Sequence, residues 1–161
     1  MKKYKYVPFY LIAAAVFISD LAVKRYILSS FETGDVFGEI PFVADFIYVR
    51  NTGAAFSILS GNTAVLGIVS IAFCIAVAIY WFRKKDKHPL LALALALLFP
   101  GALGNAVDRI AYGFVVDFIS VKWFEFPVFN IADTAIVAGA VAAVLYFLFF
   151  DKGTDNGRNN S

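Results

Sequence analysis

Long apolar segments alternate with short polar ones along this chain. Four of the apolar segments approach the length of roughly 20 residues that a membrane-spanning helix requires. They cover residues 7–28, 64–82, 89–104 and 131–150. The third alternates Leu and Ala as a half-buried strand does, but its length and helix-favouring residues predict a helix. The pattern therefore predicts four transmembrane helices.

Two of the predicted helices carry signals for how they pack. Pro100-Gly101 near the end of the third predicts a kink that frees a backbone carbonyl for a neighbouring helix. In the fourth, Ala135, Gly139 and Ala143 recur every four residues and form a small-residue stripe. Such a stripe lets two helices approach closely.

The segment between the first two predicted spans, residues 29–63, has more structure than a linker. Gly34 and Pro41 punctuate it, and residues 42–49 are rich in strand-favouring side chains. A second strand-like run covers residues 114–119. We therefore expect a small β-sheet at the membrane surface.

Composition agrees with a polytopic membrane protein. Of 161 residues, 61% are hydrophobic and only 16% are charged, whereas soluble domains carry about a quarter charged residues. We expect one domain over residues 1–150, with outer loops at 29–63 and 105–130, and a disordered cytoplasmic tail at 151–161. Cys74 and His88 are the only residues of their kinds, which excludes an intramolecular disulfide and a cysteine- or histidine-rich metal site.

The basic residues predict the orientation in the membrane. Most of them precede the first span, fill the turn between the second and third, or follow the fourth: Lys2, Lys3, Lys5, Arg83, Lys84, Lys85, Lys87, Lys152 and Arg158. The positive-inside rule places both termini and this turn in the cytoplasm. The longer loops then face outward, and the aromatic run over residues 123–129 is typical of a lipid headgroup boundary.

The lysine-rich start followed by an apolar run also matches a cleavable signal peptide. Cleavage would leave an odd number of spans and would send the basic turn outward, against the charge rule. A retained first helix is the better interpretation.

Two aspartates beside apolar segments are candidates for chemistry, because a charge near hydrocarbon is costly. Asp117 lies in a strand-like run where Val116 and Phe118 point to the opposite face; an exposed loop aspartate is the alternative. Asp133 begins the fourth predicted helix, where the helix dipole or a cap would suffice to explain it. Asn130 is itself a candidate cap.

Other polar residues near the predicted helix ends form a small set. Asp20 and Lys24, spaced i and i+4, are expected to neutralise each other in a structural pair. Asn105 lies one helical turn before Arg109, so the two side chains can face one pocket, while Asp108 and Arg109 can simply pair with other groups.

Two carboxyl groups a few ångströms apart share one proton and titrate as a unit. One can then take a proton from water while the other protonates a carbonyl oxygen or a leaving amine. Such a pair hydrolyses an amide without metal, cysteine or histidine. The sequence contains no GxSxG, HExxH or phosphate-loop motif.

Five motifs, in order and in register with the four spans, resemble those of the bacterial lipoprotein signal peptidase (signal peptidase II) family. They are DLAVK at 20–24, NTGAAF at 51–56, GALGNAVDR at 101–109, VVDF at 115–118 and FNIAD at 129–133. The resemblance implies an all-α membrane fold of four transmembrane helices, with both termini cytoplasmic and a small β-sheet on the outer face.

The resemblance also implies an aspartic endopeptidase that removes signal peptides from diacylglyceryl-modified prolipoproteins, just before the lipidated cysteine. Asp117 and Asp133 match the catalytic pair. The residues that match substrate-binding or supporting positions are Asn51, Gly53, Asn105, Asp108, Arg109 and Asn130. No metal or cofactor is implied.

The implied location is the bacterial cytoplasmic (inner) membrane, with the active site at its outer face. Expected partners are diacylglyceryl prolipoproteins, membrane lipids and cyclic-peptide inhibitors of the globomycin type, with no nucleic acid, and we expect a monomer. Val23 stands where the family more often has Ser or Thr, and Pro100 where it more often has Gly. The connection from Asp117 to Asp133 is short, and the aromatic loop at Trp123 could act as a lid.

Two other functions compete with a peptidase. In a small proton-coupled transporter, buried carboxylates would carry protons, but the polar residues gather at one face and no internal repeat is present. A non-catalytic scaffold that binds a partner through its outer loop leaves the Asn/Asp/Arg cluster unexplained. Cleavage of a lipidated substrate distinguishes all three.

Overall fold

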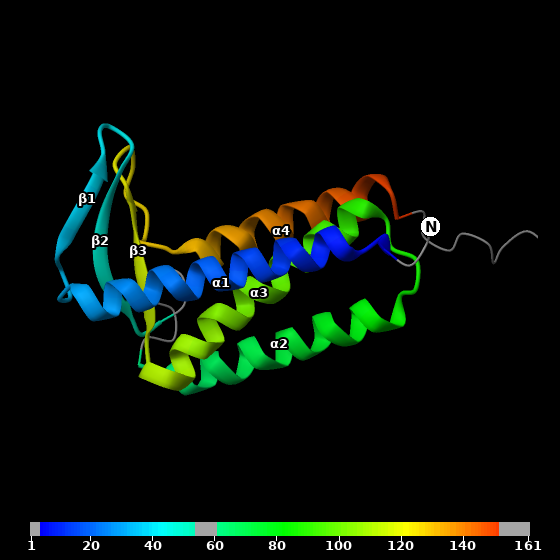
Figure 1. Ribbon diagram of the computed structural model, residues 1–161, viewed down its shortest axis with the longest axis horizontal. Coiled ribbons are helices and arrows are strands. Elements are labelled where there is room, and N and C mark those ends of the chain that lie inside the picture. Colours follow the sequence, from blue (N-terminus) through cyan, green and yellow to red (C-terminus); the bar gives the residue numbers. More distant parts are fainter. Residues whose placement is uncertain (1–3, 54–60, 152–161) are drawn as a thin grey trace, which may run out of the picture.

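The computed structural model of the protein describes residues 4–53 and 61–151. In chain order its elements are α1 (Val7–Ser30), β1 (Val36–Ile40), β2 (Ala44–Asn51), α2 (Thr63–Arg83), α3 (Pro89–Tyr112), β3 (Val115–Val121) and α4 (Ile131–Phe149). Within the described ranges, four helices are long and apolar enough to cross a membrane. They form an elongated bundle with a small sheet across one end (Figure 1), which confirms the predicted fold class.

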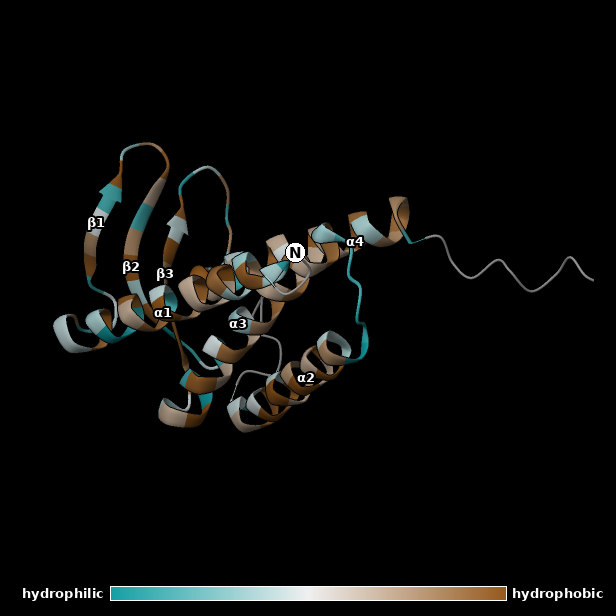
Figure 2. Cartoon of the chain, turned by 45° about the vertical axis from the view of Figure 1, so that its right-hand side comes forward, coloured by the Kyte–Doolittle hydropathy of each residue, from teal (hydrophilic) through white to brown (hydrophobic). Residues whose placement is uncertain are grey.

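Helix α3 is the centre of the bundle. It packs against each of the other three helices and is the most buried of the four. Its sequence explains this position, because seven of its twelve buried residues are alanine or glycine, which leave room for three neighbouring helices. The other helices turn large apolar side chains outward, and hydrophobic residues recur along all of them (Figure 2). In a membrane those surfaces face lipid.

Glycines let α3 and α4 approach closely. A Cβ on Gly101 would lie 2.6 Å from the carbonyl oxygen of Ala132 and 2.8 Å from Ile136 Cγ1. A Cβ on Gly139 would lie 3.0 Å from the carbonyl oxygen of Ala94. The small-residue stripe predicted in the fourth span is therefore used for packing, at its Gly139 position, against α3.

Replacing Gly101 with alanine should destabilise the protein by about 1–3 kcal/mol, because the new methyl group meets backbone that cannot move aside. The matched control is Gly67→Ala on α2, where the nearest atom to a new Cβ is 3.6 Å away. Alanine is the better helix former, so Gly67→Ala should be neutral or slightly stabilising. Thermal unfolding in detergent measures both variants; equal melting temperatures would contradict the close packing of α3 on α4.

The sheet is antiparallel with strand order β1-β2-β3. Strand β2 pairs Asn51 with Val115 and Val49 with Asp117. One face of the sheet packs Val116 and Phe118 against Ile27 of α1, together with Tyr48. This packing fixes the sheet to the end of the bundle and leaves Asp117 on the other face, as the alternation predicts.

The basic turn between α2 and α3 lies at the end of the bundle opposite the sheet. The start of α1, the α2–α3 turn and the end of α4 meet there (Figure 1). Tyr6 Oη accepts a hydrogen bond from the Lys87 backbone at 2.8 Å, and the ring of His88 stacks on Phe150 with centroids 4.4 Å apart. The basic turn and the sheet thus lie at opposite ends, while the side of the membrane that each faces stays a prediction.

The structure corrects one predicted boundary. We expected the third helix to end at 104 and an outer loop to follow from 105, but α3 continues through Pro100 to Tyr112. It ends at Gly113, which adopts the left-handed conformation (φ 76°) and donates its N–H to the Arg109 carbonyl. Strands β2 and β3 begin and end within two residues of the predicted runs 42–49 and 114–119. All but the first residue of the tail predicted to be disordered at 151–161 fall outside the described residues.

Candidate active site

The two candidate aspartates meet where the sheet joins the bundle. Asp117 is the third residue of β3 and is almost completely buried. Asp133 lies in the first turn of α4. Asn130 caps this helix: its side chain accepts the Asp133 backbone N–H at 2.8 Å, and its backbone N–H donates to Asp133 Oδ2 at 3.3 Å. The predicted cap is confirmed, and it fixes Asp133 next to Asn130.

Three asparagine side chains donate to the two carboxyl groups. Asn51 Nδ2 donates to Asp117 Oδ2, and Asn130 Nδ2 donates to Asp117 Oδ1, each at 2.7 Å. Asn105 Nδ2 donates to Asp133 Oδ1, also at 2.7 Å. Strands β2 and β3 and helices α3 and α4 thus contribute to one polar cluster.

Each of the three asparagine side chains accepts a hydrogen bond at its Oδ1 atom, and this fixes the orientation of its amide group. Asn51 Oδ1 accepts the backbone N–H of Gly53 at 2.9 Å, and Asn130 Oδ1 accepts that of Asp133. Asn105 Oδ1 accepts from Lys24 Nζ at 3.0 Å and from Asn130 Nδ2 at 3.2 Å. With the oxygens occupied, the three NH₂ groups point at the carboxyl groups.

The buried side chain of Lys24 connects this cluster to two further aspartates. Its side chain is 1% exposed, and Nζ lies 2.8 Å from Asp20 Oδ2 and 3.0 Å from Asp108 Oδ2. The predicted pairing of Asp20 with Lys24 is confirmed, but the lysine also contacts Asp108 and Asn105. These contacts join residues more than 80 positions apart, so no local sequence signal could have found them.

The two aspartates beside Lys24 also hold backbone in place. Asp20 Oδ1 accepts the N–H of Ala132 at 2.9 Å, and Asp108 Oδ2 accepts that of Val116 at 3.2 Å. Ala132 precedes Asp133, and Val116 precedes Asp117. The buried charges therefore fix the backbone next to both candidate aspartates.

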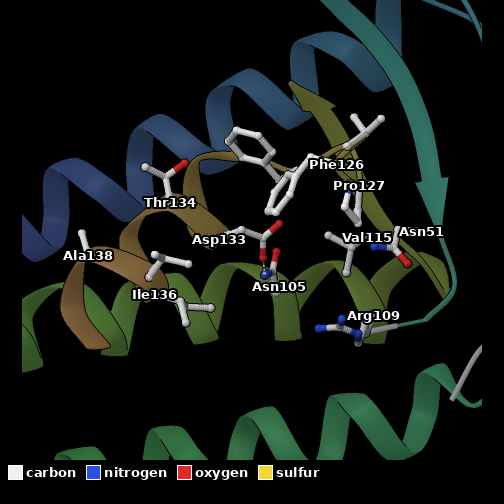
Figure 3. Close-up of a pocket in the computed structure, with 13 residues that line it drawn as sticks. Asn51, Asn105, Arg109, Val115, Phe126, Pro127, Asp133, Thr134, Ile136 and Ala138 are labelled. Carbon is white, nitrogen blue, oxygen red and sulfur yellow. Dashed lines mark hydrogen bonds between the residues drawn. The ribbon is translucent and has the colours of Figure 1, made fainter. Parts of the chain in front are cut away.

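A pocket of about 550 Å³ opens beside Asp133. Asn51, Asn105 and Arg109 lie at its polar end, together with Asp133 (Figure 3). The rest of its wall is apolar and comes from Val115, from residues 126–129 and from the first turns of α4: Thr134, Ile136, Val137 and Ala138. Val137 is 63% exposed on the outer surface of α4, so the pocket opens towards the lipid-facing side of the bundle.

Arg109 and Asn105 do face one pocket, as their one-turn spacing predicts. Arg109 Nη2 donates to the carbonyl oxygen of Gly53 at 3.2 Å. This contact joins α3 to the segment after β2 and places a positive charge at the polar end of the pocket. The last three residues of the motif at 51–56, residues 54–56, lie outside the described residues.

Burial and, after it, the neighbouring charge of Asp133 together raise the pKa of Asp117 to about 7. The hydrogen bonds from Asn51 and Asn130 act against this shift. Near neutral pH Asp117 can therefore hold or release a proton. The site combines a proton-exchanging carboxyl group, a second carboxyl group held by an asparagine, and a largely apolar pocket beside it.

Comparisons with known proteins agree with this geometry. The family model for signal peptidase (SPase) II matches residues 12–149. A lipoprotein signal peptidase of Lactobacillus gasseri is 37% identical over 152 residues, which cover 94% of this chain and 99% of that protein. One of Staphylococcus aureus is 38% identical over 160 residues, which cover 98% and 96%.

Two solved structures described as bacterial membrane enzymes, determined by the in meso method, have the same fold. One, at 2.3 Å resolution, is 36% identical with a TM-score of 0.85 and covers 99% of this chain and 97% of its own. The other, at 1.9 Å, is 38% identical with a TM-score of 0.80 and covers 93% and 97%. With a family match over most of its length and relatives above 30% identity along nearly the whole of both chains, the protein belongs to the signal peptidase II family.

Proposed function

We propose that the protein is a membrane aspartic endopeptidase that cleaves the signal peptide from diacylglyceryl-modified prolipoproteins, just before the lipidated cysteine. Family membership supports cleavage of prolipoprotein signal peptides. The observation that carries the aspartic mechanism is the hydrogen-bonded cluster in which Asn130 contacts both Asp117 and Asp133. Asp133 lines the pocket directly, and Asp117 is hydrogen-bonded to Asn51, which lines it as well.

In this mechanism the aspartate pair holds one proton near neutral pH. The ionised carboxylate accepts a proton from a water molecule as it attacks the scissile carbonyl carbon. The protonated partner then donates its proton to the carbonyl oxygen. When the C–N bond breaks, the carboxyl group that took the proton from water passes it to the leaving amine. The pKa of Asp117, at about 7, suits this exchange.

The polar residues at the pocket position the substrate. Arg109 would stabilise the negative charge that develops on the carbonyl oxygen, or hold the substrate backbone next to it. Asn51, Asn105 and Asn130 keep the two carboxyl groups in fixed orientations, which lowers the reorganisation needed during the reaction. Gly53 and Asp108 support this arrangement through Arg109 and the backbone of β3.

The pocket also suits a substrate anchored in the membrane. The lipidated cysteine would keep its acyl chains in the outer leaflet, while the signal helix lies against the bundle and its cleavage site enters beside α4. We place the enzyme in the bacterial cytoplasmic membrane with its active site at the outer face, because the basic turn lies at the other end of the bundle. A globomycin-type cyclic peptide would inhibit the enzyme by filling the same pocket.

The direct test is cleavage by the purified protein in detergent. With a diacylglyceryl prolipopeptide as substrate, mass spectrometry should show two products separated at the bond before the lipidated cysteine. The same peptide without the lipid is the control and should be cleaved far more slowly. No cleavage, or cleavage at another bond, would refute the proposal.

A further inference from the structure

A second apolar groove lies at the other end of the bundle from the aspartates. Helices α1 and α2 both pack on α3, and between them is a groove of about 200 Å³. Side chains of all three helices line it: Phe9, Tyr10, Ala13, Val77, Ala78, Trp81, Phe82, Leu95, Ala96 and Phe99. Its only polar side-chain atoms, Trp81 Nε1 and Tyr10 Oη, hydrogen-bond to each other at 2.8 Å. Apart from the Tyr10 hydroxyl, which can still donate its own proton, the groove lining is apolar.

The size of the groove limits what can occupy it. An α-helix with its side chains is about 10–12 Å across. A groove of about 200 Å³ is too small to take in a whole helix. An extended alkyl chain is narrow enough, and within the membrane it can be held there by van der Waals packing against the apolar side chains. The groove thus fits part of a single acyl chain.

Basic residues lie in the α2–α3 turn, next to the end of the groove at Trp81. The ammonium group of Lys87 lies 4.3 Å from the ring centroid of Trp81 and 4.7 Å from that of Tyr6. Arg83 and Lys85, in the same turn, are exposed. The single acidic residue of the turn, Asp86, lies 3.7 Å from Lys5. Positive charge therefore remains in excess where the groove meets the membrane surface.

We infer that this groove binds one anionic phospholipid, with an acyl chain against α3 and the phosphate group at the Arg83–Lys87 turn. The apolar lining selects the chain, and the basic turn selects a negatively charged headgroup over a zwitterionic one. The site is separate from the aspartate pair and does not depend on the proposed peptidase activity.

Native mass spectrometry of the full-length protein tests the proposal, with phosphatidylglycerol and phosphatidylcholine of identical acyl chains added in turn. The protein should retain one phosphatidylglycerol about 30-fold more tightly than phosphatidylcholine, as expected for two added basic contacts of about 1 kcal/mol each. Equal retention of the two lipids would overturn the proposal.

Matched variants separate the chain site from the headgroup site. Ala78→Phe fills the groove and should abolish the preference, whereas Ala76→Phe, on the exposed surface of the same helix, should keep it. The double variant Arg83→Gln/Lys85→Gln should also lose the preference for phosphatidylglycerol. Arg25→Gln, near the sheet end of α1, should keep this preference. If Ala78→Phe retains the lipid as well as Ala76→Phe does, the groove is not the site.

A measurement on the unfilled groove avoids any folding defect of Ala78→Phe. In a Trp123→Phe variant, Trp81 is the one remaining tryptophan, and it lines the groove. One equivalent of phosphatidylglycerol with brominated acyl chains should quench its fluorescence, and brominated phosphatidylcholine should not. Equal quenching by both would refute the site.

Discussion

Replacing either Asp117 or Asp133 with asparagine is expected to reduce cleavage of a diacylglyceryl prolipopeptide by roughly 10³-fold or more. General acid–base catalysis contributes about 10²–10⁴-fold, and asparagine can neither accept nor deliver the proton. The effect should appear in kcat, because the pocket that holds the substrate is otherwise unchanged. Single-turnover cleavage measured by mass spectrometry gives the rate.

Folding should survive both substitutions. Asparagine keeps the shape of aspartate, and one of the two hydrogen bonds that Asp117 accepts from Asn51 and Asn130 remains possible. The matched control is Asp45→Asn, which alters a partly exposed aspartate of β2 that pairs with Lys122. The control should cleave at the wild-type rate. Normal activity in Asp117→Asn or Asp133→Asn, in protein with a wild-type melting temperature, would exclude the aspartate pair.

Lys24→Met is the second substitution expected to have a large effect. It leaves the carboxylates of Asp20 and Asp108 buried without their cation and removes a charged donor from Asn105. Breaking a buried ion pair by removing one partner costs about 3–5 kcal/mol. Thermal unfolding should show this loss, while Arg25→Met, at the exposed neighbouring position, should have little effect.

A double variant separates stability from positioning. In Lys24→Met/Asp20→Asn one unpaired charge is removed, so part of the stability should return. Asn105 still lacks the ammonium group that fixes its oxygen, so kcat should remain reduced by up to roughly 100-fold, as for a small misplacement of a catalytic group, with KM nearly unchanged. If activity recovers together with stability, Lys24 does not position Asn105.

The sequence predicts the four helices well because about 20 consecutive apolar residues are a strong, local signal. It places the end of α3 too early because Asn105, Asp108 and Arg109 interrupt the apolar run. The structure shows why they belong to the helix: Asn105 and Arg109 line the pocket one turn apart, and Asp108 contacts Lys24. Polar side chains that bind one another inside the protein resemble a loop when their partners are unknown.

The candidate site is predictable in its residue types but not in its connections. Asp117 and Asp133 are identified by carboxylates beside apolar segments and by the family motifs. The contact of Lys24 with Asn105, and that of Arg109 with the Gly53 carbonyl, join segments distant in sequence. Such pairings depend on how the helices pack, which local sequence does not specify. Strand β1 was not predicted as a separate strand, because its five residues include Gly38, which weakens the pattern.

The most direct test of the account is the titration of the Asp117 carboxyl group by ¹³C NMR in detergent, with the signal assigned by its loss in Asp117→Asn. The account predicts a pKa of about 7. It also predicts a lower pKa in the Asp133→Asn variant, because the neighbouring negative charge is gone while the burial remains. Two results would contradict a pair that shares one proton. One is a pKa of Asp117 at the ordinary value of 3.8, and the other is a pKa that does not change in the Asp133→Asn variant.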